Sequence, residues 1–482
     1  MRSLFLACAL CAAGIGAAAA VRQDAGPGRG RPSILHGGSS EGADSRGTPP
    51  NGPRDAEDTA AGHVVLRDDG SLAFARSSSV ASADGPPPEV VAEGNFTASS
   101  EHPSGFGELR LRTLPGRDDR LQARAAGFLE GWLTAEAIFD HQYNIQYYFD
   151  GLGNGTKAIL SWLGSADKWT TEQVAAHDAT VAAMGSARDS PKGNGKHDHS
   201  RWWRAVGLVL EQLNGIMEGY NARVDDMGTR SVLTKLERKQ LLLLNGLGEL
   251  MDLIPMFITG QSPELLPGLP ADVAWRRLAT SGHCSALIRL TGDLSDLMIG
   301  HVTWNTYYSM VRVYKHYDFT AMTDASLVGK RVSMSSYPAA VSSIDDFYIV
   351  GSSDGSMVVM ETTNDVLDAK LHELVTPQAA LSQYRVMAAN LLARNGQEWV
   401  DLVQLYHSGA YNNQYMVVDL KRFTPGEELR AGLLTVMEIM PGYAESADVT
   451  KQLEVGFWAS YNVPYFNEVY RRMGYPAMRA AF

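Results

Sequence analysis

The stretch HCSALIRLTGDLSDLMIGHVTW, residues 283–304, marks the point at which the chain changes character. Within it, the runs at 284–290 and 297–304 are short and rich in branched and aromatic side chains, which is typical of β-strands. Similar runs recur farther along the chain, at 347–353, 356–363, 415–420 and 432–440. The sequence therefore predicts a group of strands after residue 283.

Upstream of this stretch the apolar residues recur at three- and four-residue steps, which is the period of an α-helix. The clearest series runs from Leu121 to Phe149. Further helices are predicted at 171–184, 201–224, 231–251 and, later, 365–395. The dipeptide Asp354-Gly355 favours a hairpin turn between two of the predicted strands. Strands that pair locally, with helices before and between them, indicate the α+β class.

The composition is that of a globular protein with a polar leader. The 482 residues carry 54 acidic and 42 basic side chains, a net charge of -12, which argues against a nucleic-acid partner because such surfaces have a basic excess. Apolar residues make up 45% of the chain, enough to bury a sizeable core. Residues 21–90 are instead rich in Gly, Pro, Ser and Arg, so we predict a disordered leader and order from about Val90.

The first 20 residues have the pattern of a cleaved secretory signal peptide. A basic residue precedes an apolar run that ends in small residues; a membrane anchor is the alternative reading. No later segment is apolar enough to span a bilayer, so no transmembrane segment is predicted. Two N-glycosylation sequons, at Asn95 and Asn154, are compatible with passage through the secretory pathway.

Removal of the signal peptide would leave Cys284 as the only cysteine. A lone cysteine in a secreted protein is an intermolecular bridge, an inert buried thiol or a reactive nucleophile. A cut between His283 and Cys284 would place a new α-amino group, with a reference pKa of about 7.7–8.0, beside the thiol. That amine could take the thiol proton and deliver it to the leaving group. A papain-like protease, a weaker reading, would need a separate histidine and a signature that the chain lacks.

At this point the sequence resembles the phospholipase B-like family of lysosomal or secreted N-terminal-nucleophile hydrolases. The resemblance covers roughly residues 90–482 and is carried by the stretch around Cys284 and by GFLEGWLTAEAIFDHQYN, SSYPAAVSSIDDFYIVGSSDGSMVVMETTN, YNNQYMVVDLKRFTPG and FWASYNVPYFNEVY. It implies a four-layer αββα sandwich. In that fold a helix-rich fragment, 91–283, and a nucleophile-bearing fragment, 284–482, form one globular unit.

The resemblance also implies site roles for His301 and Trp304. His301 would form hydrogen bonds during self-cleavage or turnover, and Trp304 would form a pocket wall. By residue type alone, both could be core residues. On a strand, residues three apart point to opposite faces, so a turn or bulge would be needed for both to face one pocket.

Polar residues on later motifs complete the predicted site. Thr362 and, less strongly, Thr363 could hydrogen-bond the substrate or the amine, although Thr is also common in β-strands without any functional role. The resemblance assigns Asn462 a side-chain amide that would donate to an oxyanion, whereas an Asx turn before a proline is the structural alternative. Asn412 and Asn413 are possible additional site residues that could equally be turn residues.

The predicted function is self-processing between His283 and Cys284, followed by hydrolysis of amide or ester bonds in acyl-lipid-like substrates through a Cys284 thioester. The alternative is a catalytically weak or inactive lipid-binding glycoprotein, and both would be lysosomal or extracellular. No metal or organic cofactor is expected, and the two fragments should stay associated because separation would expose their shared core. The family pattern continues to a site arginine that lies past Phe482, so we expect the fragment 284–482 to be shortened at its end.

Overall fold

The computed structural model describes residues 60–76, 89–183, 199–258, 283–344 and 347–481. The predicted signal peptide, 1–20, and most of the predicted leader lie outside these ranges. The strands are β1 (Ala60–Leu66), β2 (Leu72–Arg76), β3 (Val90–Thr97), β4 (Gly107–Thr113), β5 (His283–Leu290), β6 (Leu297–Trp304), β7 (Val313–Asp318), β8 (Arg331–Ser336), β9 (Phe347–Ser352), β10 (Gly355–Thr363), β11 (Asn413–Asp419), β12 (Leu434–Met440), β13 (Tyr443–Asp448) and β14 (Phe457–Ser460).

The helices lie mostly before β5 and between β10 and β11. They are α2 (Asp119–Leu133), α3 (Ala135–Asp150), α4 (Asn154–Ala183), α5 (His199–Met227), α6 (Arg238–Asn245), α7 (Leu250–Phe257), α9 (Ser382–Leu392), α10 (Gly396–Val403), α11 (Asn467–Arg472) and α12 (Tyr475–Ala481).

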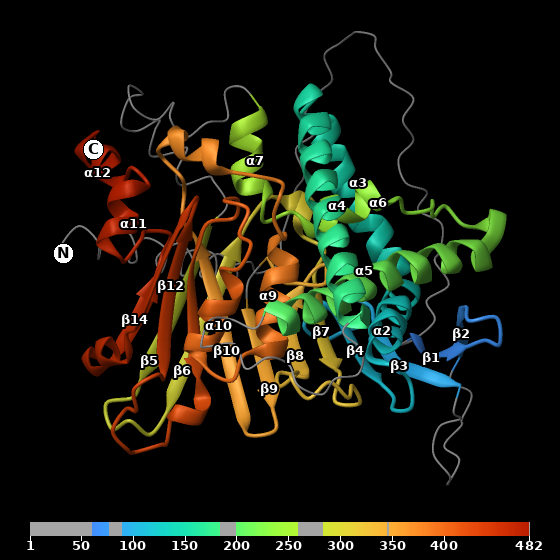
Figure 1. The fold of residues 1–482 in the computed structure, drawn as a ribbon, viewed down its shortest axis with the longest axis horizontal. Coiled ribbons are helices and arrows are strands. Elements are labelled where there is room, and N and C mark those ends of the chain that lie inside the picture. The colour runs from blue at the N-terminus through green and yellow to red at the C-terminus, as the bar shows by residue number, and fades with distance from the viewer. Residues whose placement is uncertain (1–59, 77–88, 184–198, 259–282, 345–346, 482) are drawn as a thin grey trace, which may run out of the picture. The chain divides into compact units, whose positions relative to one another are not determined.

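Two sheets organise the described residues (Figure 1). The larger has 11 strands in the order β13-β12-β11-β10-β9-β8-β7-β4-β3-β1-β2, and the smaller has the order β14-β5-β6. In the larger sheet β4 and β7 pair in parallel, whereas the other neighbouring strands pair antiparallel. This pairing of β4 with β7 joins the chain before Cys284 to the chain after it in one sheet.

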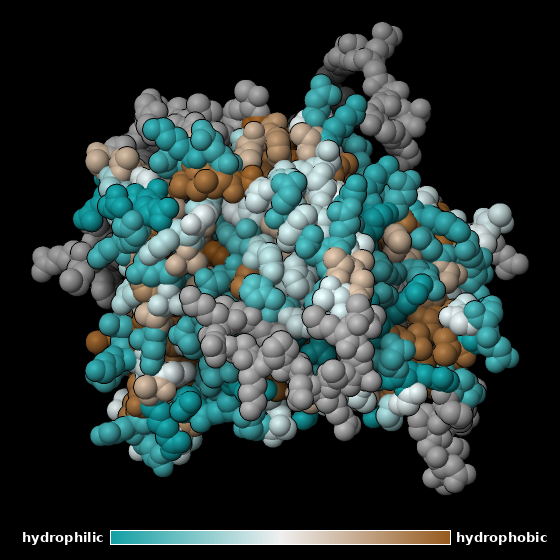
Figure 2. Space-filling view, in the orientation of Figure 1, coloured by the Kyte–Doolittle hydropathy of each residue, from teal (hydrophilic) through white to brown (hydrophobic). Residues whose placement is uncertain are grey.

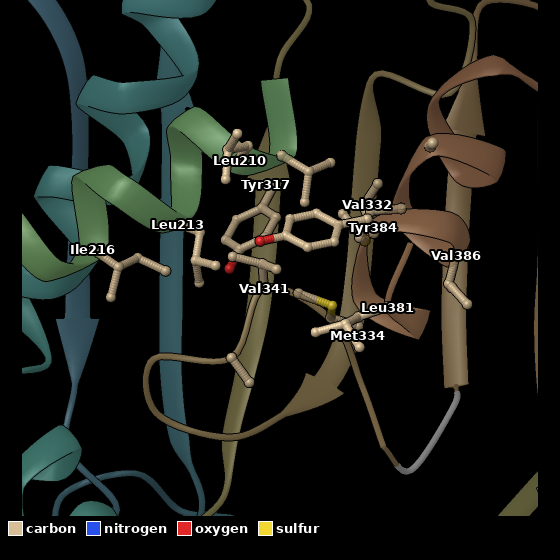
Figure 3. Packing of buried hydrophobic residues seen from close by; sticks show 14 of the residues in the cluster. Leu210, Leu213, Ile216, Tyr317, Val332, Met334, Val341, Leu381, Tyr384 and Val386 are labelled. Carbon is tan, nitrogen blue, oxygen red and sulfur yellow. The ribbon is translucent and has the colours of Figure 1, made fainter. Parts of the chain in front are cut away.

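Apolar side chains cover both faces of the large sheet. On one face, α2, α5 and α9 pack over the central strands; Leu213 of α5, Tyr317 of β7 and Tyr384 of α9 meet in this core (Figure 3). On the other face, the small sheet packs over β10, β11 and β12 through a second core that includes Ile288, Met360 and Val436. The order of layers is therefore helices, large sheet and small sheet.

Glycines allow α2 and α5 to cross in backbone contact. A Cβ atom added at Gly127 would lie 1.9 Å from the backbone oxygen of Gln212, and one at Gly219 would lie 1.9 Å from that of Phe128. Such distances are far inside van der Waals contact, so only glycine permits this approach. The close crossing fixes the helical layer that supports the large sheet.

The structure corrects several sequence predictions about secondary structure. β1 and β2 form a hairpin at the edge of the large sheet although they fall in the predicted leader, so order begins well before Val90. The chain before Cys284 also contributes β3 and β4, and is less helical than predicted. The predicted helix from Leu121 to Phe149 is two helices, α2 and α3, separated at Thr134.

The other predicted elements agree with the structure to different degrees. The predicted helix at 171–184 is the end of the longer α4, the one at 201–224 lies within α5, and the one at 231–251 is reduced mainly to α6. The helix predicted at 365–395 contains α9 after a 3-10 segment. The hairpin at Asp354-Gly355 is confirmed, with Ser352 opposite Gly355 in the register of β9 and β10.

The α+β class is confirmed by the helices and the large mixed sheet. Leu287, Val302 and Phe457 are exposed on the outer face of the small sheet, so the fourth layer of the predicted sandwich stays a prediction. The face shown in Figure 2 is mainly hydrophilic, with apolar residues in scattered patches. Among the described helices, none combines the length and apolar character needed to cross a membrane.

Candidate active site

Strand β5 points the thiol of Cys284 toward the large sheet. Along this strand Cys284, Ala286, Ile288 and Leu290 are buried while the residues between them are more exposed. Side chains alternate between the two faces of a strand, and Ile288 and Leu290 belong to the core between the sheets. Cys284, only 4% exposed, therefore faces this interior. It is the second residue of β5.

The side chain of Asn462 holds the backbone nitrogen of Cys284. Its Oδ1 accepts a hydrogen bond from Cys284 N at 3.1 Å, and its Nδ2 donates to the carbonyl oxygen of Thr363 at 2.6 Å. The amide oxygen, not the N–H group, is turned toward Cys284. One N–H of the amide is directed to Thr363, and the predicted donation of the amide to an oxyanion stays a prediction.

The loop that carries Asn462 is anchored on both sides. Asn462 has a positive φ of 63°, and its carbonyl oxygen accepts from the hydroxyl of Tyr475 at 3.2 Å. The carboxylate of Glu438 accepts from the backbone N–H groups of Tyr465 and Phe466. Burial raises the pKa of Glu438 to about 6 and raises that of Tyr475 well above its usual value, so Tyr475 stays a hydroxyl donor at neutral pH.

A row of polar atoms leads from the thiol into the interior. The Sγ atom of Cys284 lies 3.6 Å from Oγ1 of Thr303, and this oxygen lies 3.4 Å from Nδ1 of His301. The Nε2 atom of His301 is 2.8 Å from the carbonyl oxygen of Glu361. The sequence reasoning missed Thr303, although its two-residue spacing from His301 places both on one face of β6.

Trp304 lies on the opposite face of the small sheet from His301. The register between β5 and β6 runs without a bulge from His283↔Trp304 to Leu290↔Leu297, so the alternation of side chains is unbroken. Trp304 is 40% exposed on the outer face. The unbroken register therefore places Trp304 and His301 on opposite faces of β6, and the role of Trp304 as a pocket wall stays a prediction.

The end of β10 supports the site at three points. Besides the two carbonyl oxygens that meet His301 and Asn462, the hydroxyl of Thr362 lies 2.6 Å from that of Ser460, two residues before Asn462. Thr362 is fully buried. Thr362 thus links β10 to β14, and Thr363 offers its backbone carbonyl to Asn462. Hydrogen bonding of either threonine to a substrate stays a prediction.

Asn412 and Asn413 bind buried carboxylates behind this strand. Asn412 Nδ2 donates to Asp252 at 3.0 Å. With the amide of Asn413 turned so that its oxygen accepts from the hydroxyl of Tyr415, its nitrogen donates to the carboxylate of Glu361 at 3.0 Å. Burial raises the pKa of Asp252 to about 7. Asn412 also donates to the carbonyl oxygen of Gly409 at 2.9 Å, so these amides hold the backbone around the site. Their roles as additional site residues stay predictions. Glu361 is an acidic residue at the end of the apolar run before Thr362, and this unusual position was the sequence signal for a buried carboxylate near the site.

The two sequons lie in different settings. Asn95 is half-buried within β3, whereas Asn154 is exposed at the start of α4.

Among the residues that the structure describes, no three His, Cys, Asp or Glu side chains are grouped as a metal site.

Comparisons with known proteins agree with one another. The family model for phospholipase B matches residues 92–482. Phospholipase B-like protein D of Dictyostelium discoideum is 35% identical over 79% of this chain and 62% of its own length. Human phospholipase B-like 1 is 34% identical over 80% of this chain and 63% of its own length, and phospholipase B of Crotalus adamanteus is 33% identical over 77% and 63%. The chain thus spans less than two thirds of the length of these relatives.

Proposed function

The chain belongs to the phospholipase B family, and we propose that it is a self-processing N-terminal-nucleophile hydrolase. Cleavage between His283 and Cys284 would free an amino group on the residue that holds the thiol. The mature enzyme would then cleave amide or ester bonds of acyl-lipid-like substrates, in a lysosome or outside the cell. Names of relatives such as phospholipase B support the substrate class.

The observation that carries this proposal is that both reactive atoms of Cys284 have polar partners. Its nitrogen is held by Asn462 at 3.1 Å, and its sulfur lies 3.6 Å from a hydroxyl. After cleavage the same nitrogen would be the α-amino group, whose reference pKa of about 7.7–8.0 suits a general base near neutral pH. Asn462 would then fix the amine beside the thiol through its amide oxygen.

Turnover would proceed through a thioester. The amine takes the proton from the sulfur, the sulfur attacks the carbonyl carbon of the substrate, and the proton passes to the departing amine or alcohol. Water then breaks the carbon–sulfur bond, releases the fatty acid and restores the thiol. The thiol, the amine and amide donors supply these steps, so the proposal needs no metal or organic cofactor.

The two fragments would remain associated after cleavage. β4 precedes the cut and β7 follows it, and the two pair along their length. Buried Glu130 of α2 also binds buried Lys315 of β7 at 2.6 Å. Separation would break this sheet and expose charged and apolar groups of a single core, which is strongly unfavourable.

Mass spectrometry and N-terminal sequencing of the purified full chain test the proposal. We expect a fragment that begins at Cys284 in the wild type and an uncut chain in the Cys284→Ala variant. Size-exclusion chromatography should keep the two fragments in one peak. An intact wild-type chain with a thiol that alkylating probes cannot reach would refute self-processing.

The low exposure of Cys284, 4%, is the observation that favours the alternative, a lipid-binding glycoprotein with an inert thiol. The Cys284→Ala variant separates the two functions. A binding protein should retain lipid affinity in this variant and form no acyl-thioester in the wild type. A hydrolase should accumulate the acyl-thioester on Cys284 and lose all turnover when the thiol is removed.

A further inference from the structure

We propose that Thr303 relays the thiol proton of Cys284 to His301 during self-cleavage. The inference rests on the proposed function and deepens it by naming the base of the first step. Before cleavage the nitrogen of Cys284 is a peptide N–H that donates to Asn462 at 3.1 Å, so it cannot act as a base. Another group must take the thiol proton in the uncut chain.

The hydrogen-bond directions in the row of polar atoms follow from one carbonyl group. The oxygen of Glu361 can only accept, so Nε2 of His301, 2.8 Å away, carries a hydrogen atom. In the neutral imidazole, Nδ1 is then the unprotonated nitrogen and accepts from the hydroxyl of Thr303 at 3.4 Å. The oxygen of Thr303 is left to accept from the thiol at 3.6 Å.

The register of the small sheet builds this row. Thr303 is directly opposite Cys284 in the pairing of β5 with β6, and such neighbours have Cβ atoms about 4.5–5.5 Å apart. His301 lies two residues earlier and therefore on the same face of β6. In the same register His301 is opposite Ala286, not opposite Cys284. A proton that moves between the sulfur and the imidazole therefore passes through the hydroxyl of Thr303. Long hydrogen bonds in a resting site commonly shorten as the reaction proceeds.

The step balances without an outside reagent other than water. The thiol proton moves to Thr303 as the Thr303 proton moves to His301, and the sulfur bonds to the carbonyl carbon of His283. The bond from that carbon to the nitrogen of Cys284 then breaks, and the nitrogen receives the proton back. Water hydrolyses the resulting thioester, which yields a carboxylate on His283 and the free thiol and amine on Cys284.

The rate at which the Cys284 fragment appears in the full chain tests the relay. Thr303→Val keeps the shape of the side chain but removes the hydroxyl, and should slow cleavage about 100-fold or more, the usual contribution of a positioned base. Thr303→Ser restores the hydroxyl and should recover most of the rate. Thr113→Val is the matched control: this buried hydroxyl on β4 has no hydrogen-bond partner among the described residues, so cleavage should continue at the wild-type rate.

A double-variant comparison separates the relay from a packing effect. If His301 and Thr303 act as one unit, His301→Gln and Thr303→Val should each cost nearly as much as both together. Multiplying losses would overturn the relay, as would wild-type cleavage in Thr303→Val or no recovery in a folded Thr303→Ser. Appearance of the fragment in Cys284→Ala would instead overturn the proposed self-processing itself.

Discussion

Replacing Asn462 with glycine or with alanine separates the two contributions of this residue. Its amide bonds the nitrogen of Cys284 and the carbonyl of Thr363, and its backbone has a φ of 63°. Both substitutions remove the amide. Only alanine adds backbone strain, because a Cβ atom makes the left-handed conformation unfavourable and glycine has none.

The structure sets the expected size of each effect. Loss of two hydrogen bonds, at about 1 kcal/mol each, should lower the free energy of unfolding by about 2 kcal/mol in Asn462→Gly. Asn462→Ala should lose a further 1–2 kcal/mol, roughly, from the left-handed backbone. The rate of self-cleavage should fall in both variants to a similar extent, since neither can hold the nitrogen of Cys284.

Urea unfolding in the Cys284→Ala background measures the stability, because this background keeps the chain uncut. Cleavage rates are measured separately with Cys284 present, by mass spectrometry over time. Equal stability of the glycine and alanine variants would refute the strain argument. Cleavage at the wild-type rate in Asn462→Gly would refute the role of the amide in holding the reacting nitrogen.

Three further predictions concern the scaffold. Gly219→Ala should lower the free energy of unfolding by about 1–3 kcal/mol, because its Cβ would lie 1.9 Å from a backbone oxygen of α2. Gly164 has open space around it, so Gly164→Ala should raise the free energy of unfolding by up to about 1 kcal/mol. Thermal melts compare the two variants. Burial raises the pKa of Asp252 from 3.8 to about 7, so its contribution to stability is present below pH 3.8 and is lost as the pH rises to about 7. The free energy of unfolding should therefore decline by roughly 4 kcal/mol over that range. Asp252→Asn should remove this decline, as measured by urea titrations at several pH values. Lys315→Met should leave Glu130 as an unpaired buried charge and cost about 3–5 kcal/mol, with partial recovery in the double variant with Glu130→Gln, measured by the same unfolding assay.

Local patterns account for the elements that sequence reasoning placed well. The short runs of branched and aromatic side chains after residue 283 are a local feature of the sequence, and they located β5, β6, β9, β10, β11 and β12. The same pattern did not reveal β1 and β2, which are held by pairing: β1 pairs with β3, and β2 pairs with β1 at the edge of the large sheet.

The sequence by itself determined the α+β class and the family, since these follow from periodicity and motifs within the chain. Tertiary structure alone decided the partners of Cys284. Asn462 is 178 residues away, and its amide orientation is set by a carbonyl at the end of β10. The unbroken register of β5 and β6 turned Trp304 outward and brought Thr303 to the sulfur. A linear pattern gives the face of each strand, but only the packing of two sheets brings distant polar atoms together.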